Sequence, residues 1–187
     1  NTPATFFQRC AAGLIDLIVL VPIIAVQWAA FKYSREATIA LLIPLSYAFV
    51  AYVIYCHGRY GQTLGKRVMN IRVLTEGGEP LSWRNAWARS SVDVSLCTLS
   101  TASMFTALLL IPDALYYKDS SIEQLKNLQA LEPTWGSWAA TAGQIWAWGE
   151  LVTMLLNKRR RALHDFIGGT VVVSERALPS GASLSDA

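Results

Sequence analysis

Long apolar runs separated by short polar links dominate the chain. Four runs, each about 20 residues long, show no alternation of apolar and polar positions at period two, which argues against barrel strands. A helix of about 20 apolar residues spans the ~30 Å hydrocarbon core of a bilayer. The pattern therefore predicts four transmembrane helices, over residues 10–31, 38–56, 90–112 and 135–156.

The links between these runs carry patterns of their own. In the loop 57–89, residues 63–69 are typical of a short interfacial helix, with Leu64 and Val68 opposite two basic residues. Residues 68–74 and 80–83 flank a Glu-Gly-Gly-Glu turn and predict a β-hairpin, with which a strand over 170–174 could pair. In the external link 113–134, leucine and isoleucine recur every third residue, which indicates an amphipathic helix on the outer surface.

The predicted fold class is an all-α integral membrane protein. It has four transmembrane helices and a small cytoplasmic β-hairpin or strand element. We expect one membrane domain over residues 1–176 and a flexible tail, rich in Pro, Ser, Gly and Ala, over 177–187.

Basic residues are distributed unevenly between the two sides of these spans. Arg9, the loop 57–89 and the C-terminal segment together hold twelve Lys and Arg, whereas the links 32–36 and 113–134 hold four. Positive charge accumulates on the cytoplasmic side of membrane proteins, so both termini and the loop 57–89 are predicted to be cytoplasmic. The predicted location is a bacterial plasma (inner) membrane.

Composition narrows the function classes. Only 16% of the residues are charged, against about 25% in soluble domains. The basic residues border apolar helices and form no separate basic domain, so we expect no nucleic-acid partner. The three cysteines form no CxxC pair, and no serine or cysteine lies in a nucleophilic arrangement. We therefore expect no metal, no cofactor and no enzymatic activity.

Three acids lie within the predicted spans, where charges are rare and costly. Asp16, Asp93 and Glu150 all fall in the cytoplasmic halves of their helices. Their related depths predict one polar pocket, open to the cytoplasm, in which a cation or proton could bind. The alternative is that these charges only fix how the helices pack in lipid, because buried charges can serve either purpose.

Further charged residues lie close to this predicted pocket. Arg89 precedes Asp93 by one helical turn, and His164 directly precedes Asp165 just past the last span. A histidine beside an acid can relay protons, or the pair can cap a helix end. We take Arg9, Asp16, Asp93, Glu150 and Asp165 as candidate binding residues, supported by Arg89 and His164.

Several of these residues also resemble a family signature. Arg9 at the start of the first span, Asp16 within it, and Asp165 after Arg160-Arg161-Ala162-Leu163-His164 resemble the RDD family, named for one arginine and two aspartates. The segments Gly61-Gln62-Thr63-Leu64-Gly65-Lys66-Arg67 and Gly168-Gly169-Thr170 are similar too. The resemblance implies a multi-pass bundle with a role in transport, in some members sodium–proton exchange.

Two functions follow as hypotheses. The first is a small ion-coupled or proton-coupled transporter, with Asp16 as the central group and Arg9 and Asp165 at the cytoplasmic mouth. Four helices are few for a complete pathway, so this hypothesis predicts a homo-oligomer in the lipid bilayer. The alternative is a non-catalytic accessory subunit that packs against a larger membrane protein complex through its tryptophan-rich fourth helix.

Overall fold

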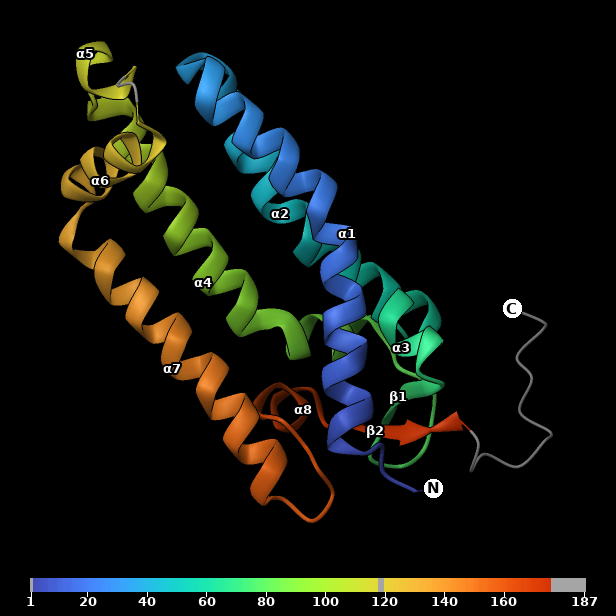
Figure 1. The fold of residues 1–187 in the computed structure, drawn as a ribbon. Helices are drawn as coiled ribbons and strands as arrows, with labels where there is room; N and C mark the ends of the chain where they lie inside the picture. The colour runs from blue at the N-terminus through green and yellow to red at the C-terminus, as the bar shows by residue number, and fades with distance from the viewer. Residues whose placement is uncertain (1, 118–119, 176–187) are drawn as a thin grey trace. The chain divides into compact units, whose positions relative to one another are not determined.

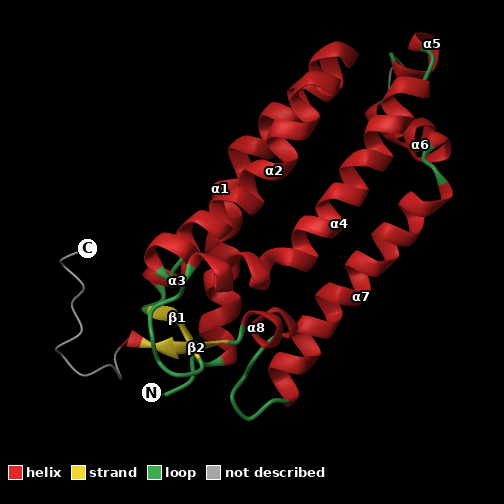
Figure 2. Cartoon of the chain, turned by 180° about the vertical axis from the view of Figure 1, so that it is seen from behind, coloured by secondary structure: helices red, strands yellow, loops and turns green. Residues whose placement is uncertain are grey.

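The computed structural model describes residues 2–117 and 120–175, and the predicted tail 177–187 lies outside them. The described chain is mostly helical, and its strands are confined to one small sheet (Figures 1 and 2). In chain order the elements are α1 (Phe6–Tyr33), α2 (Arg35–Tyr60), α3 (Leu64–Val68), β1 (Ile71–Thr75), α4 (Trp83–Leu110), α5 (Asp113–Tyr116), α6 (Ser121–Leu131), α7 (Thr134–Leu156), α8 (Leu163–Gly168) and β2 (Thr170–Ser174).

All four predicted apolar segments are helical, as α1, α2, α4 and α7. Among the described residues, the helices long and apolar enough to cross a membrane are three, namely α1, α2 and α4. The helix α7 has 23 residues, but tryptophans, glycines and Glu150 lower the hydropathy of its sequence. Three candidate spans are therefore supported by length and composition, and a fourth through α7 stays a prediction.

The sheet differs in part from the predicted hairpin. The strand β1 pairs with β2 in antiparallel fashion, from Ile71 opposite Ser174 to Thr75 opposite Thr170, so the predicted long-range pairing is confirmed. The predicted second hairpin strand over 80–83 is wrong. Pro80 makes a single bridge to Leu74, and proline has no N–H with which to extend a ladder. The chain instead enters α4, where the side chain of Ser82 accepts a bond from the Asn85 N–H.

Two compact units can be distinguished in the chain. Unit 1 comprises the described residues of 1–18, 52–90 and 149–187, and unit 2 comprises those of 19–51 and 91–148. The four long helices each contribute residues to both units. That residues 1–176 act as a single domain stays a prediction.

Unit 1 has a small apolar core around the sheet. Ile71, Val73 and Val172 from the two strands pack with Ala4 and Ala12 from the N-terminal segment and α1. The helix α3 lies beside β1, and α8 leads through Gly169 into β2 (Figure 1). Gly169 ends α8 at φ 61°, a left-handed conformation that glycine adopts without steric cost. The core therefore holds the two strands against the N-terminal segment and α1.

Unit 2 has a separate core built from α2, α4, α5 and α6. Its buried members include Leu42, Leu108, Tyr116 and Leu128. The Tyr116 hydroxyl donates to the Phe31 carbonyl at 2.8 Å, and the Gln124 amide donates to the same oxygen at 2.9 Å. The predicted amphipathic helix of the link 113–134 is confirmed as α6, whose Leu128 is buried.

Candidate functional site: a buried charged cluster beside a docked helix

The site is centred on Asp165, in the first turn of α8. Its side chain is completely buried, although it carries a charge. One carboxylate oxygen, Oδ2, accepts the Ala162 N–H at 3.0 Å, which caps the start of the helix. The other oxygen, Oδ1, accepts the Thr170 hydroxyl at 3.2 Å. Thus α8 and β2 are both tied to one carboxylate.

Two arginines from distant helices neutralise this carboxylate. Arg9 of α1 donates from Nη2 to Oδ2 at 2.6 Å, and Arg89 of α4 donates from Nη1 to Oδ1. Their side chains are only 8% and 4% exposed. Such paired and hydrogen-bonded charges are tolerated in an interior, whereas an isolated one is not. Burial alone would raise the pKa of Asp165, but the charges of Arg89 and Arg9 hold it well below its usual range.

A histidine and a glutamate extend the network from Arg89. His164 Nε2 lies 2.5 Å from Arg89 Nη2, and His164 Nδ1 contacts Glu150 Oε1. An arginine can only donate, so Nε2 accepts from it and the ring proton on Nδ1 is donated to the Glu150 carboxylate. Burial and the charge of Arg89 lower the pKa of His164, which favours this neutral form. We call Arg9, Arg89, Glu150, His164, Asp165 and Thr170 the Asp165 cluster.

Asp16 has different partners from those of Asp165. It is 6% exposed and accepts three bonds, from the Thr63 hydroxyl at 2.5 Å, the Gly65 N–H at 2.8 Å and the Tyr52 hydroxyl at 3.1 Å. These donors are neutral, and two of them come from the start of α3, where Thr63 is the N-cap. Asp16 thus binds the first turn of α3, and the helix dipole favours its negative charge there.

The dock of α3 on α1 requires glycine at position 65. A Cβ on Gly65 would collide with the Ala12 backbone carbonyl and lie 3.0 Å from Asp16 Cγ. Gly61 ends α2 in a left-handed conformation, at φ 67°, which turns the chain back toward α3. We call Asp16, Tyr52, Thr63 and Gly65 the Asp16 dock. It explains why the Gly61–Arg67 segment carries glycines and a threonine at these spacings.

The dock also positions a lysine that can change its charge near neutral pH. Lys66 Nζ lies 3.1 Å from His57 Nε2 at the end of α2. Burial, with the charge of Arg89 next in importance, lowers the pKa of Lys66 from 10.5 to about 7. His57 is 2% exposed, and among the described residues its buried Nδ1 has no hydrogen-bond partner. Lys66 and His57 are therefore adjacent bases that can share one proton.

The predicted site residues are thus divided between the units. Arg9, Glu150 and Asp165 meet in the Asp165 cluster with Arg89 and His164, whereas Asp16 belongs to the separate dock. Asp93 is exposed and belongs to unit 2, where it accepts the Trp146 indole N–H at 3.0 Å. Among the described contacts, no single partner binds all three acids that the sequence placed in one pocket.

Sequence reasoning missed Lys66, His57, Thr63 and Tyr52. Lys66 and Thr63 lie in the Gly61–Arg67 segment, which the sequence analysis treated only as a short interfacial helix and as part of the family resemblance. His57 lies in the last turn of the 26-residue helix α2, and that position was the available signal. Tyr52 gave no signal, because one tyrosine among several in α2 has no distinguishing pattern.

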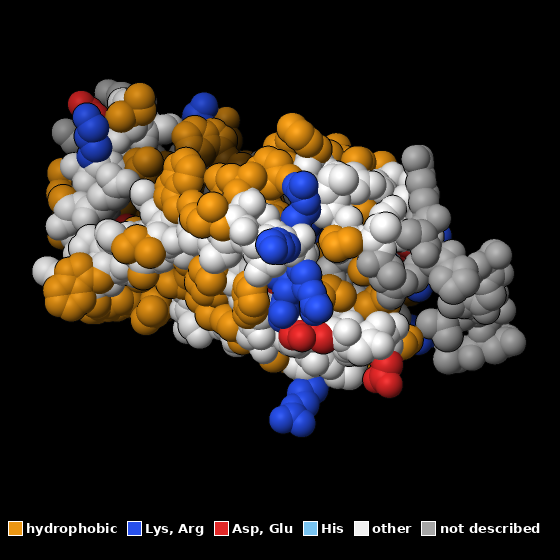
Figure 3. All heavy atoms as spheres, turned by 90° about the horizontal axis from the view of Figure 1, so that it is seen from below, with side chains coloured by type: hydrophobic (Ala, Val, Ile, Leu, Met, Phe, Trp, Pro, Cys, Tyr) orange, Lys and Arg blue, Asp and Glu red, His pale blue; other side chains and the backbone are white. Residues whose placement is uncertain are grey.

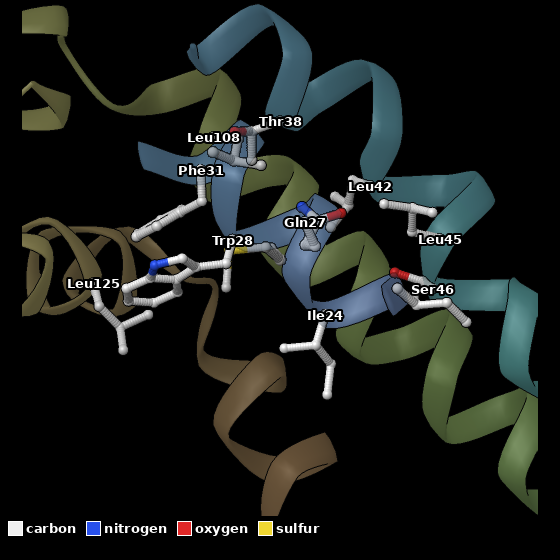
Figure 4. A pocket seen from close by; sticks show the side chains of 12 residues that line it. Ile24, Gln27, Trp28, Phe31, Thr38, Leu42, Leu45, Ser46, Leu108 and Leu125 are labelled. Atoms are coloured by element: carbon white, nitrogen blue, oxygen red, sulfur yellow. The ribbon is translucent and has the colours of Figure 1, made fainter. Parts of the chain in front are cut away.

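An apolar cavity in unit 2 is a weaker candidate. It has a volume of about 330 Å³ and is lined by side chains such as Ile24, Trp28, Phe31 and Leu42 (Figure 4). Gln27 is among the few polar residues in its wall, and no lining residue carries a titratable acid or base. This cavity therefore suits lipid tails better than ions or protons.

Together, three helices able to span a bilayer and a buried cluster of charges define an integral membrane protein with an internal polar site. Residues 3–169 match the RDD family, and the chain belongs to that family. Arg9, Asp16 and Asp165, the residues of the family resemblance, thus have structural partners: the first and last bind each other, and Asp16 binds α3. No curated protein and no solved structure matches the chain.

Proposed function

We propose that this protein is a small proton-coupled transporter of monovalent cations, with Lys66 and His57 as its proton-exchanging pair. The carrying observation is the 3.1 Å contact between the partly buried Lys66 and the buried His57 in unit 1. A lysine with a pKa of about 7 gains or loses its proton under physiological conditions. An ordinary lysine, with a pKa near 10.4, would keep its proton throughout.

The neighbouring groups supply the other elements of an exchange site. Arg89 and Arg9 add positive charge near Lys66, and this repulsion favours release of its proton. The carboxylate of Asp16 acts in the opposite direction and favours the charged lysine. A cation that enters near Asp16 would therefore drive the proton off Lys66, which couples the two species.

In this proposal the Asp165 cluster and the Asp16 dock hold the pair in place. Asp16 positions α3, which carries Lys66, and Asp165 ties α1, α4 and α8 together. Asp16 is thus a positioning residue as well as a nearby charge. We further propose that α7 is a fourth span, that both termini face the cytoplasm of a bacterial cell, and that the transporter is a homo-oligomer.

Proton movement in reconstituted vesicles tests the proposal. Purified protein is placed in liposomes that contain a pH-sensitive dye, and a sodium or potassium gradient is imposed. We expect a protein-dependent change in luminal pH that Lys66→Met abolishes. Methionine has a similar length without the charge, so the variant should melt at the same temperature or higher. Arg84→Gln, which removes an exposed charge of unit 1, is the matched control and should transport normally.

A second function, an accessory subunit of a larger membrane complex, is favoured by a different observation. The carboxylates of Asp16 and Asp165 are each engaged by several donors of the chain itself, as in a purely structural framework. In that case the wild-type protein would give no cation-dependent change in luminal pH. It would instead purify reproducibly with a larger partner, and this pair of results would replace the transporter proposal.

A further inference from the structure

A polar cavity in unit 1 lies apart from the Asp165 cluster and has a different charge. It has a volume of about 890 Å³, and the end of α2, α3, β1 and the residue after β2 form its wall. Three arginines line it, one from each of α2, α3 and β1: Arg59, Arg67 and Arg72. Three guanidinium groups around one cavity of this size indicate an anionic ligand with several oxygens.

One acid partly offsets this positive charge. Glu175 forms an ion pair with Arg72, whose Nε lies 2.9 Å from the carboxylate, and it accepts a hydrogen bond from the Gln62 amide at 2.8 Å. Three arginines and one glutamate leave an excess of two positive charges in the lining. That excess of positive charge favours an anion such as a phosphate group, whose oxygens accept charge-assisted hydrogen bonds from guanidinium groups.

The surroundings of the cavity point to a lipid as the source of the phosphate. Leu64 and Val68 of α3 are more than half exposed, and so are Tyr55 and Tyr60 at the end of α2. Apolar and tyrosine side chains at the end of a membrane-spanning helix typically lie at the level of the lipid headgroups. Figure 3 shows Lys and Arg side chains among exposed apolar ones on one face of the molecule, without identifying this cavity.

We propose that this cavity binds the phosphate-bearing headgroup of an anionic phospholipid. Arg59 and Arg67 contact the phosphate from the membrane side, while Arg72 is held in the cavity wall by Glu175. The acyl chains of the lipid lie against Leu64, Val68 and Tyr60. This site binds lipid whether or not the protein transports protons.

Retention of lipid by the whole protein tests the proposal. Protein in detergent is titrated with phosphatidylglycerol or phosphatidylcholine, and bound lipid is counted by native mass spectrometry. We expect phosphatidylglycerol to bind preferentially. Arg67→Gln should weaken its binding about tenfold, since one charge-assisted contact is lost. Glu175→Gln should strengthen binding severalfold, because it removes the opposing charge and keeps an oxygen for Gln62 and Arg72.

The controls distinguish specific binding of the lipid in the cavity from non-specific electrostatic attraction between anionic lipid and the basic protein surface. Lys158→Gln removes an equally basic, exposed residue of unit 1 outside the cavity, and it should leave phosphatidylglycerol binding unchanged. Equal loss of binding in Lys158→Gln and Arg67→Gln, or equal retention of the two lipids, would overturn the proposal. Displacement of the lipid by inorganic phosphate at similar concentration would also overturn it, by identifying a soluble anion as the ligand. Unchanged melting temperatures without lipid show that each variant is folded.

Discussion

Unit 1 and unit 2 bury different kinds of polar side chain. In unit 1, five of the buried polar groups carry or can carry a charge: Asp16, His57, Arg89, Arg161 and Asp165. In unit 2 the buried polar side chains among the described residues are neutral: Thr38, Thr101, Ser103 and Gln124. Neutral hydroxyls and amides are sufficient to satisfy backbone groups between packed helices. Stability alone therefore does not call for the charges of unit 1.

The difference between the units concerns stability, because buried charges and buried neutral groups contribute differently to the free energy of unfolding. A buried ion pair is often no more stabilising than an apolar pair of similar size, because both charges lose their hydration. Removing one partner alone is much more costly, since the other charge is then left unpaired. The paired buried charges of unit 1 thus add little to the free energy of unfolding, although removing one member of a pair lowers it strongly. Such an arrangement is consistent with a role in proton exchange.

The largest expected difference between the units comes from removing a carboxylate. Asp165→Asn leaves Arg9 and Arg89 buried without their counter-charge, and we expect a loss of about 3–5 kcal/mol in the free energy of unfolding. Asp113→Asn removes the acid that pairs with Arg35 in unit 2 at 2.9 Å. Its side chain is 70% exposed, so this control should cost at most about 1 kcal/mol. Denaturation in detergent micelles measures both, and equal losses would contradict the comparison.

A smaller effect is expected where α3 docks on α1. Gly65→Ala forces a methyl group against the backbone of Ala12, which cannot move aside as a side chain can. We expect a loss of about 1–3 kcal/mol, together with faster proteolysis near α3. Gly143→Ala in α7 adds the same methyl group where no atom lies within 4 Å, and it should be nearly neutral. A neutral Gly65→Ala would show that α3 is not held against α1.

The neutral network of unit 2 should give a still smaller effect. Tyr116→Phe removes a hydroxyl that lies 2.8 Å from both the Phe31 carbonyl and the Thr38 hydroxyl. The Phe31 carbonyl keeps its bond from Gln124, so no buried acceptor is stranded. We expect a loss of about 1 kcal/mol in the free energy of unfolding. A loss as large as that of Asp165→Asn would remove the distinction between the units.

Stability is also expected to depend on alkaline pH. The pKa of Lys66 is lowered to about 7 in the folded protein. Between that value and the unfolded pKa of about 10.4, the unfolded chain binds more protons, so stability should rise with pH across this interval. Below pH 7 both states are protonated and this contribution no longer changes. Chemical denaturation at a series of pH values should show the rise in wild type and a smaller one in Lys66→Met.

The sequence predicted much of the fold because apolar periodicity is local information. The four apolar runs became helices, and the residues 63–69 became α3 with its cap at Thr63. The strand over 170–174 was predicted from composition, but the absence of a hairpin partner at Pro80 was not. Proline is tolerated in an edge strand, so the sequence around Pro80 allowed either a hairpin strand or a single bridge. The sequence alone did not show that β2 would be the strand that pairs with β1.

Individual site residues were easier to predict than their partners. Charges within or beside the apolar helices made Asp16, Glu150, Arg9 and Asp165 candidates, and the family signature includes three of these four residues, Arg9, Asp16 and Asp165. The contacts between Arg9 and Asp165, 156 residues apart, depend on how the helices pack. Asp93 showed the limit of reasoning from depth alone, since residues at similar depth can belong to different units. Lys66 was missed because its burial follows from the docking of α3, which no local pattern encodes.

The protonation state of Lys66 tests the central claim most directly. Protein labelled with ¹⁵N at the lysine side chains can be titrated by NMR in lipid nanodiscs, and Lys66→Met assigns the signal. The account predicts that the Lys66 ammonium signal titrates with a midpoint near pH 7. A midpoint near 10 for Lys66 would make it a permanent cation at neutral pH. That result would contradict a proton shared between Lys66 and His57.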